Sequence, residues 1–187
     1  VAKAVDNKLA QEAISKDDVQ GIGIGVPGPV DSQGVVHRCV NLGWGVVNVA
    51  EELGNLTGLK IKVGNDANVA ALGEMWQGGA KGSKDVIMVT LGTGVGGGII
   101  VDGKVVAGFN GAGGEIGHIT VNNDEIEACN CGQYGCLEQY TSATGIVRLA
   151  KRKLAKSTEE TSIREIPNLT AKDVFDAAKA GDAIAIG

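Results

Sequence analysis

Apolar positions in the first part of the chain follow two spacings, one typical of helices and one typical of buried strands. Residues 3–15 place Ala, Val, Leu and Ile at helical spacing among charged and amide side chains, which predicts a helix. The same criteria predict further elements: strands at 19–26, 35–36 and 59–63, and helices at 46–53 and 66–76. Val69, Leu72 and Trp76 share one face of the last of these helices, and Gly78 and Gly79 are expected to end it.

The second part of the chain changes from alternating strands and helices to a hairpin and then to helices. Residues 96–101 and 104–107 predict a hairpin around the two-residue turn Asp102-Gly103. The other predicted elements are strands at 85–91 and 119–121, and helices at 137–155 and 170–180. This order indicates an α/β protein with mixed sheets.

Composition favours a globular protein with a core of small aliphatic side chains, because 43% of the 187 residues are hydrophobic and only 3% are aromatic. Glycine accounts for 30 residues, more than double the usual share of ~7%, and the glycines cluster between apolar runs. The net charge of −5 argues against nucleic acid as a partner. No apolar run approaches the ~18–20 residues of a membrane span, and no signal peptide opens the chain, so we expect a cytoplasmic location.

The densest glycine cluster follows a predicted strand, in the segment Leu-Gly-Thr-Gly-Val-Gly-Gly-Gly at 91–98. Such a loop can hold phosphate through backbone N–H groups and the Thr93 hydroxyl. It is not a Rossmann fingerprint, because a strand rather than a helix follows it. It is not a Walker A motif either, because Val105 stands where Ser or Thr is required. A tightly packed glycine hairpin is the alternative, and the loop alone leaves both interpretations open.

Asp66 stands where a predicted strand ends and a predicted helix begins. Asp is common at helix N-caps, and the segment alone favours that structural role. The functional alternative is a carboxylate at the end of a strand, where ligands of α/β proteins bind. A helix N-terminus stabilises the ionised carboxylate, which could then accept a proton from a hydroxyl group.

A metal site is predicted by three crowded cysteines and a histidine shortly before them. These residues are His118, Cys129, Cys131 and Cys136. A Cys₃His set is typical of closed, structural zinc sites, and Gly132 and Gly135 would let the short loop wrap around the ion. Buried reduced thiols with a surface histidine are the alternative, which the crowding disfavours. Cys39 and His37 lack a supporting motif and are interpreted as a small apolar core residue and a surface imidazole.

Taken together, five segments resemble the ROK family of bacterial sugar kinases and repressors, most closely its ATP-dependent glucokinases. They are Gly-Ile-Gly-Val-Pro-Gly-Pro-Val-Asp (23–31), Asn-Asp-Ala-Asn-Val-Ala-Ala-Leu-Gly-Glu (65–74), the glycine segment at 91–98, Gly-Glu-Ile-Gly-His (114–118) and Cys-x-Cys-Gly-x-x-Gly-Cys-Leu-Glu (129–138). Their order and spacing fit over nearly the whole chain.

The resemblance implies an actin-like, hexokinase-like (ribonuclease H-like) fold with two lobes and a sugar cleft. Residues 1–64 would belong to the small lobe and 65–187 to the large lobe, with a zinc-stapled loop at 115–138. The implied reaction is phosphoryl transfer from ATP, with Mg²⁺, to the 6-hydroxyl of glucose, which gives glucose 6-phosphate. The implied partners are glucose or a related hexose, ATP, and further copies of the chain in a homodimer or larger homo-oligomer.

The resemblance also implies roles for individual residues, with Asp66 as the general base for the sugar 6-hydroxyl. The implied ligands are Asn65, Asp66, Glu115, His118 and Glu138 for sugar hydroxyls, Gly92, Thr93 and Gly94 for phosphate, and His118, Cys129, Cys131 and Cys136 for structural Zn²⁺. His118 would use one ring nitrogen for zinc and the other for sugar.

Two motifs of ROK kinases are absent from the sequence: the opening Asp-x-Gly-Gly-Thr phosphate loop and the later adenosine-binding glycine segment. The expectation is therefore an internal piece of a longer kinase that is inactive alone. The alternatives are a sugar-responsive ROK transcriptional repressor and a kinase for fructose, mannose or an N-acetylhexosamine. Polyphosphate as the donor also stays open. The Asn65-Asp66 pair and the glycine segment favour a kinase.

Overall fold

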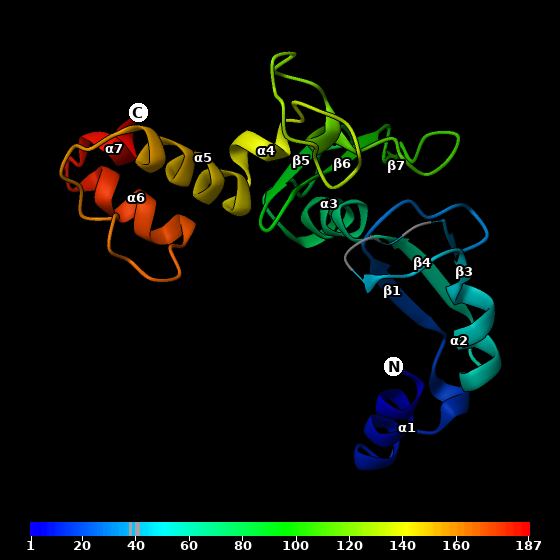
Figure 1. The fold of residues 1–187 in the computed structure, drawn as a ribbon. Coiled ribbons are helices and arrows are strands. Elements are labelled where there is room, and N and C mark those ends of the chain that lie inside the picture. The colour runs from blue at the N-terminus through cyan, green and yellow to red at the C-terminus, as the bar shows by residue number, and fades with distance from the viewer. Residues whose placement is uncertain (38, 40–41) are drawn as a thin grey trace. The chain divides into compact units, whose positions relative to one another are not determined.

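The structure is a computed structural model that describes residues 1–37, 39 and 42–187, and Figure 1 shows the order of its elements. Its contacts divide the chain into two compact units. The first unit contains Val1–Met88 and Gly98–Gly114, and the second contains Val89–Gly97 and Glu115–Gly187. The lobe boundary between residues 64 and 65 stays a prediction.

The first unit contains both helices and strands. Its elements up to residue 77 are α1 (Ala2–Gln11), the 3₁₀ helix η1 (Lys16–Asp18), β1 (Ile22–Val26), β2 (Val35–Val36), β3 (Val47–Asn48), α2 (Val49–Thr57), β4 (Ile61–Asn65) and α3 (Asp66–Gln77). Strands β1 and β4 pair in parallel, with Val26 opposite Asn65, and β2 and β3 pair antiparallel. The core of this unit consists of Val26, Val30, Val36, Cys39 and Val49. The expectation that Cys39 is an apolar core residue is confirmed, because it is 1% exposed.

One boundary in the first unit differs from the expectation, and the exposure of α3 is a further finding. The helix expected from residue 46 begins at Val49, because Val47 and Asn48 pair with β2 and the Asn48 side chain accepts a hydrogen bond from Glu51 N. The apolar face of α3 is exposed, with Trp76 73% exposed. The helix instead buries Ala67, Asn68 and Ala71.

The reason for the buried face of α3 is a close approach to a glycine of β6. A Cβ atom on Gly98 would lie 2.6 Å from both Ala67 O and Ala71 Cβ. Alanines on the helix and a glycine on the strand allow this close contact. The larger side chains of α3, such as Trp76, are exposed instead.

The strands β5 (Val86–Leu91), β6 (Val95–Val101) and β7 (Lys104–Val105) form a sheet in the order β5-β6-β7. β6 and β7 are antiparallel, and Asp102 and Gly103 in the turn between them have φ angles of 50° and 72°. The predicted hairpin is therefore confirmed. Together with the parallel pair of β1 and β4, it gives the mixed strand directions expected of this α/β protein.

The second unit is mainly helical beyond residue 115. Its elements are the 3₁₀ helix η3 (Ile116–His118), α4 (Glu138–Thr141), α5 (Ala143–Lys156), α6 (Ala171–Lys179) and α7 (Ala183–Ile186). The single helix expected at 137–155 is interrupted at Ser142, which accepts a hydrogen bond from Gly145 N and caps α5. The strand expected at 119–121 is also wrong, because only an isolated bridge between Thr120 and Cys136 forms there.

The α-helices α5, α6 and α7 pack around the core of the second unit. This core contains Ala150, Ile163, Leu169, Val174, Ala177 and Ile184. Thr170 and Asp173 form a capping box at the start of α6. Among the described residues, no helix is both long and apolar enough to cross a membrane.

Candidate functional site

Asn65 and Asp66 stand at the junction between β4 and α3 in the first unit. Asn65 is the N-cap of α3, because its Oδ1 accepts a hydrogen bond from Asn68 N at 3.1 Å. Its Nδ2 donates to Gly28 O at 3.2 Å, which ties the loop after β1 to the end of β4. The capping role favoured for Asp66 by the sequence was therefore wrong. Asp66 is the first residue of the helix, is exposed, and accepts a hydrogen bond from its neighbour Ala67 N at 2.8 Å.

The predicted metal ligands lie together in the second unit. His118, Cys129, Cys131 and Cys136 each present a donor atom, and these atoms all lie within 4.8 Å of one another. Cys131 Sγ and Cys136 Sγ are 3.7 Å apart, and Cys129 Sγ is 3.8 Å from His118 Nδ1. Two sulfur ligands of a tetrahedral zinc ion, each at ~2.3 Å, are ~3.8 Å apart. The four residues therefore fit zinc in number, type and spacing.

Burial raises the pKa of the Cys129 thiol to about 12, and it also raises the pKa of Cys136. A metal ion at these thiols must displace their protons, as thiolate ligation requires. His118 presents Nδ1 to the cysteines, so its Nε2 remains for another partner, and this atom lies 4.0 Å from Glu115 Oε2.

The loop that carries the cysteines is held by a close backbone contact and by the side chain of Gln139. Gly135 has a φ of 70°, and a Cβ atom there would overlap Asn122 O. The buried Gln139 accepts a hydrogen bond from Cys136 N at 3.0 Å and donates one to Glu127 O at 2.9 Å. These contacts fix the two ends of the segment that approach the metal cluster.

A buried ion-pair network that the sequence analysis missed anchors the same loop to α5. The Glu125 side chain is 1% exposed and accepts hydrogen bonds from Arg152, Arg148 and the Tyr140 hydroxyl. The Arg152 guanidinium, as the largest cause, holds the pKa of Glu125 well below its ordinary value. The pairing of Arg148 and Arg152 on one face of α5 is the sequence signal that could have indicated an acidic partner.

Glu138, the first residue of α4, connects the metal loop with the glycine segment. Its Oε1 accepts a hydrogen bond from Cys129 Sγ at 3.4 Å, and its Oε2 accepts one from Val95 N at 3.1 Å. A Cβ atom on Gly94 would overlap Glu138 Oε2. Three of the predicted sugar ligands, Glu115, His118 and Glu138, are thus gathered around the metal cluster. Asn65 and Asp66 belong to the other unit.

The glycine segment between β5 and β6 contacts the junction between α4 and α5. Gly92 O accepts a hydrogen bond from Ala143 N at 2.9 Å, and Thr93 O accepts one from Thr144 Oγ1 at 2.7 Å. A side chain at position 94 would displace the Glu138 carboxylate, which agrees with the packing interpretation at this glycine, whereas nothing lies within 4 Å of a Cβ atom on Gly92. Gly92 and Thr93 are also exposed residues, which is compatible with the phosphate interpretation.

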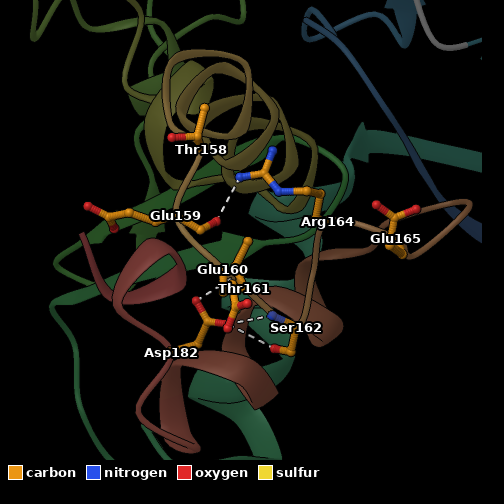
Figure 2. Close-up of a pocket in the computed structure, with 8 residues that line it drawn as sticks. All are labelled: Thr158, Glu159, Glu160, Thr161, Ser162, Arg164, Glu165 and Asp182. Atoms are coloured by element: carbon orange, nitrogen blue, oxygen red, sulfur yellow. Dashed lines mark hydrogen bonds between the residues drawn. The ribbon is translucent and has the colours of Figure 1, made fainter.

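The lining of a surface pocket of about 640 Å³ contains none of the predicted site residues (Figure 2). It is lined by Thr158, Glu159, Glu160, Thr161, Ser162, Arg164, Glu165 and Asp182. The Asp182 carboxylate accepts hydrogen bonds from Thr161 and Ser162, and it also caps α7 (Figure 2). These bonds lower the pKa of Asp182, the backbone N–H of Ser162 being the largest cause. Its polar groups serve the local structure, so we do not assign a ligand to this pocket.

Comparison with known proteins decides the family, because the sequence profile of the ROK family matches residues 1–186. The chain belongs to the ROK family. It is 46% identical over 190 aligned residues to the glucokinase of Halalkalibacterium halodurans, an alignment that covers 100% of this chain and 58% of that protein. The chain thus spans about half the length of the curated relatives it matches.

Solved structures show that this ROK chain has the α/β hexokinase-like fold that the resemblance implied. The ROK glucokinase of Streptomyces griseus in complex with glucose and AMPPNP is 36% identical, with a TM-score of 0.78 over 99% of this chain and 61% of that chain. A ROK transcriptional regulator, a homologue of the E. coli MLC protein, is 28% identical, with a TM-score of 0.84 over 99% of this chain and 46% of that chain.

Proposed function

We propose that this ROK chain is part of an ATP-dependent glucokinase that phosphorylates the 6-hydroxyl of glucose. The observation that carries the proposal is that different residues cap α3 and present a carboxylate at its start. Asn65 caps the helix, so the exposed carboxylate of Asp66 is not needed as the cap and can act as a base. The similarity to glucokinases over the whole chain supports the same assignment.

In this proposal Asp66 accepts the proton of the 6-hydroxyl as the oxygen attacks the terminal phosphate. A positioned general base contributes ~10²–10⁴-fold to the rate. Asn65, Glu115, His118 and Glu138 hold the other sugar hydroxyls, and their neutral and anionic acceptors suit an uncharged polyhydroxyl ligand. ATP with Mg²⁺ supplies the phosphoryl group and the charge neutralisation, and Gly92, Thr93 and Gly94 offer backbone donors to it.

The proposed role of zinc at His118 and the three cysteines is structural, because four protein ligands leave no open coordination position. Bound zinc would hold Nδ1 of His118 and thereby fix the ring orientation, with Nε2 directed to a sugar hydroxyl. It would also hold the loop that carries Cys129, whose Sγ lies 3.4 Å from Glu138 Oε1 and would no longer donate a hydrogen bond to it as a thiolate.

The test is calorimetric titration of glucose into the complete gene product, as wild type and as Asp66→Asn, with MgATP-dependent turnover measured on the same samples. We expect both proteins to bind glucose and only the variant to lose turnover, by about 10²-fold or more. Equal turnover in the two proteins would overturn the role of Asp66. Fructose, mannose and N-acetylglucosamine, assayed beside glucose, test the choice of sugar.

A sugar-responsive repressor is the second candidate, favoured by the similarity to the ROK transcriptional regulator. Under this alternative the wild-type protein binds sugar but transfers no phosphate to it from MgATP. DNA binding that changes with sugar would then identify the repressor.

We also propose the cytoplasmic location and the homo-oligomeric state that the sequence led us to expect. Cell fractionation tests the location, and light scattering tests the oligomeric state.

A further inference from the structure

Thr144, at the start of α5, contacts the glycine segment although the resemblance assigns it no role. Its hydroxyl donates to Thr93 O at 2.7 Å, across 51 positions of sequence. The neighbouring backbone group Ala143 N donates to Gly92 O at 2.9 Å. Two successive carbonyls of the glycine segment are therefore held against the N-terminus of a 14-residue helix, where unpaired N–H groups favour acceptors.

These two contacts determine where the following N–H groups point. In a planar trans peptide the C=O of one residue and the N–H of the next point in opposite directions. None of the described peptide bonds is cis. The N–H of Thr93 is therefore directed away from α5 by the bond at Gly92 O, and the N–H of Gly94 is directed away from α5 by the bond at Thr93 O. Successive N–H groups presented to one side form a concave site for an anion.

A third contact fixes the other end of the same turn. Val95 N donates to Glu138 Oε2 at 3.1 Å, and Val95 itself is 5% exposed. The turn is thus bound at both ends: Gly92 and Thr93 are bonded to the start of α5, and Val95 is bonded to Glu138 of α4. Its exposed part, Gly92 and Thr93, has few ways to rotate its peptide planes while these bonds persist.

We propose that Thr144 is a positioning residue for the phosphate donor, because its hydroxyl fixes the peptide plane that presents Gly94 N–H to a phosphate oxygen. This inference rests on the proposed kinase function and adds a residue to it. It assigns the anion subsite to the N–H groups of Thr93 and Gly94, and it applies to a nucleotide triphosphate and to polyphosphate alike. Thr144 does not touch the donor itself.

The test compares Thr144→Val with Thr144→Ser in the complete gene product, with MgATP or inorganic polyphosphate as donor and glucose as acceptor. Thr144→Val keeps the shape of the side chain but removes the hydroxyl that donates the hydrogen bond to Thr93 O. We expect it to raise the KM for the phosphoryl donor that the wild type uses by about 3- to 10-fold. We expect the Kd for glucose, measured by calorimetry, to stay within about twofold of wild type. Thr144→Ser retains the hydroxyl and restores the donor KM.

Thr141→Val is the matched control. Thr141 also donates its hydroxyl to a backbone carbonyl, Leu137 O, at 3.1 Å, but this bond joins α4 to its own N-cap residue and does not involve the glycine segment. We expect it to leave the donor KM unchanged. If valine crowds the junction and Thr144→Val does not fold, Thr144→Ala is judged by the same criterion.

A donor KM that is unchanged in a folded Thr144→Val or Thr144→Ala protein overturns the positioning role, while wild-type turnover still supports the kinase. An equal loss of donor and glucose affinity also overturns it, because a general structural role would have that effect. Absence of turnover with both donors in the wild type instead identifies a failure of the proposed function, before any variant is made.

Discussion

The carboxylate of Glu138 occupies the space that any side chain at position 94 would need, because a Cβ atom on Gly94 would overlap Glu138 Oε2. The same oxygen accepts the hydrogen bond from Val95 N. Glycine at position 94 leaves room for the Glu138 carboxylate, and the glycine segment and the metal loop both contact this one side chain. Because of this contact, a change in the glycine segment, which is the predicted phosphate site, is expected to move Glu138, which is a predicted sugar ligand.

Gly94→Ala is expected to displace Glu138 and to break its bond to Val95 N. Loss of one such bond costs ~1 kcal/mol, and a charged acceptor raises this to ~1.5–3 kcal/mol. We expect the melting temperature of the complete gene product to fall by several degrees and its affinity for glucose to decrease. Gly92→Ala is the control for stability, because nothing lies within 4 Å of a Cβ atom there. Equal melting temperatures of the two variants would contradict the prediction.

Two glycines of the metal loop separate backbone strain from close packing. Gly132 and Gly135 both have positive φ, 91° and 70°, but only Gly135 is crowded, by Asn122 O. We expect Gly132→Ala to cost ~1 kcal/mol through strain alone and to keep its zinc. Gly135→Ala must also move the backbone beside Cys136, so we expect reduced zinc content by metal analysis and a lower melting temperature. Equal zinc content in both variants would show that this backbone contact is dispensable.

The buried carboxylate of Glu125 predicts a stability difference that depends on pH. Glu125→Gln removes the buried charge partner of Arg148 and Arg152, which keep the exposed Glu127, and we expect it to cost ~1.5–3 kcal/mol at pH 7. The pKa of Glu125 is lowered in the folded state, so its contribution is complete above its ordinary value of 4.5 and is lost progressively below that pH. Denaturation at pH 7 and at about pH 3.5 should therefore show a smaller gap between variant and wild type in acid.

Glu127→Gln is the matched control for this pH prediction. Glu127 pairs with the same two arginines, but its side chain is 50% exposed. Exposed pairs contribute ~0–1 kcal/mol, so we expect a small effect at pH 7 with little pH dependence. If Glu127→Gln matched Glu125→Gln at both pH values, burial would not be the source of the stability.

Local chemistry explains which parts of the fold and the site the sequence could predict. The turn Asp102-Gly103 requires positive φ at both residues, so its hairpin follows from two adjacent side chains. The metal cluster follows from ligand residues crowded into one segment, and its atoms do lie together. In both cases the information is contained in a few neighbouring residues.

The features that the sequence did not predict depend on contacts between distant segments. The buried face of α3 is decided by Gly98, and the anchoring of the metal loop by Arg148 and Arg152, which lie more than 20 positions from Glu125. The helix predicted at 137–155 is interrupted at Ser142, where α5 begins, and Thr144 in the first turn of α5 donates a hydrogen bond to the glycine segment. Periodicity within one segment carries no signal for such partners.

The pair Asn65 and Asp66 allows a direct separation of structural and chemical roles. Asn65→Ala removes the N-cap of α3 and the bond to Gly28 O, so we expect the free energy of unfolding to fall by ~1–2 kcal/mol. Asp66→Asn retains an acceptor for Ala67 N, so we expect its stability to stay within about 0.5 kcal/mol of wild type. Chemical denaturation of the complete gene product measures both. A stability loss in Asp66→Asn equal to that in Asn65→Ala would mean that Asp66 serves the helix, and would remove the structural support for its role as the base.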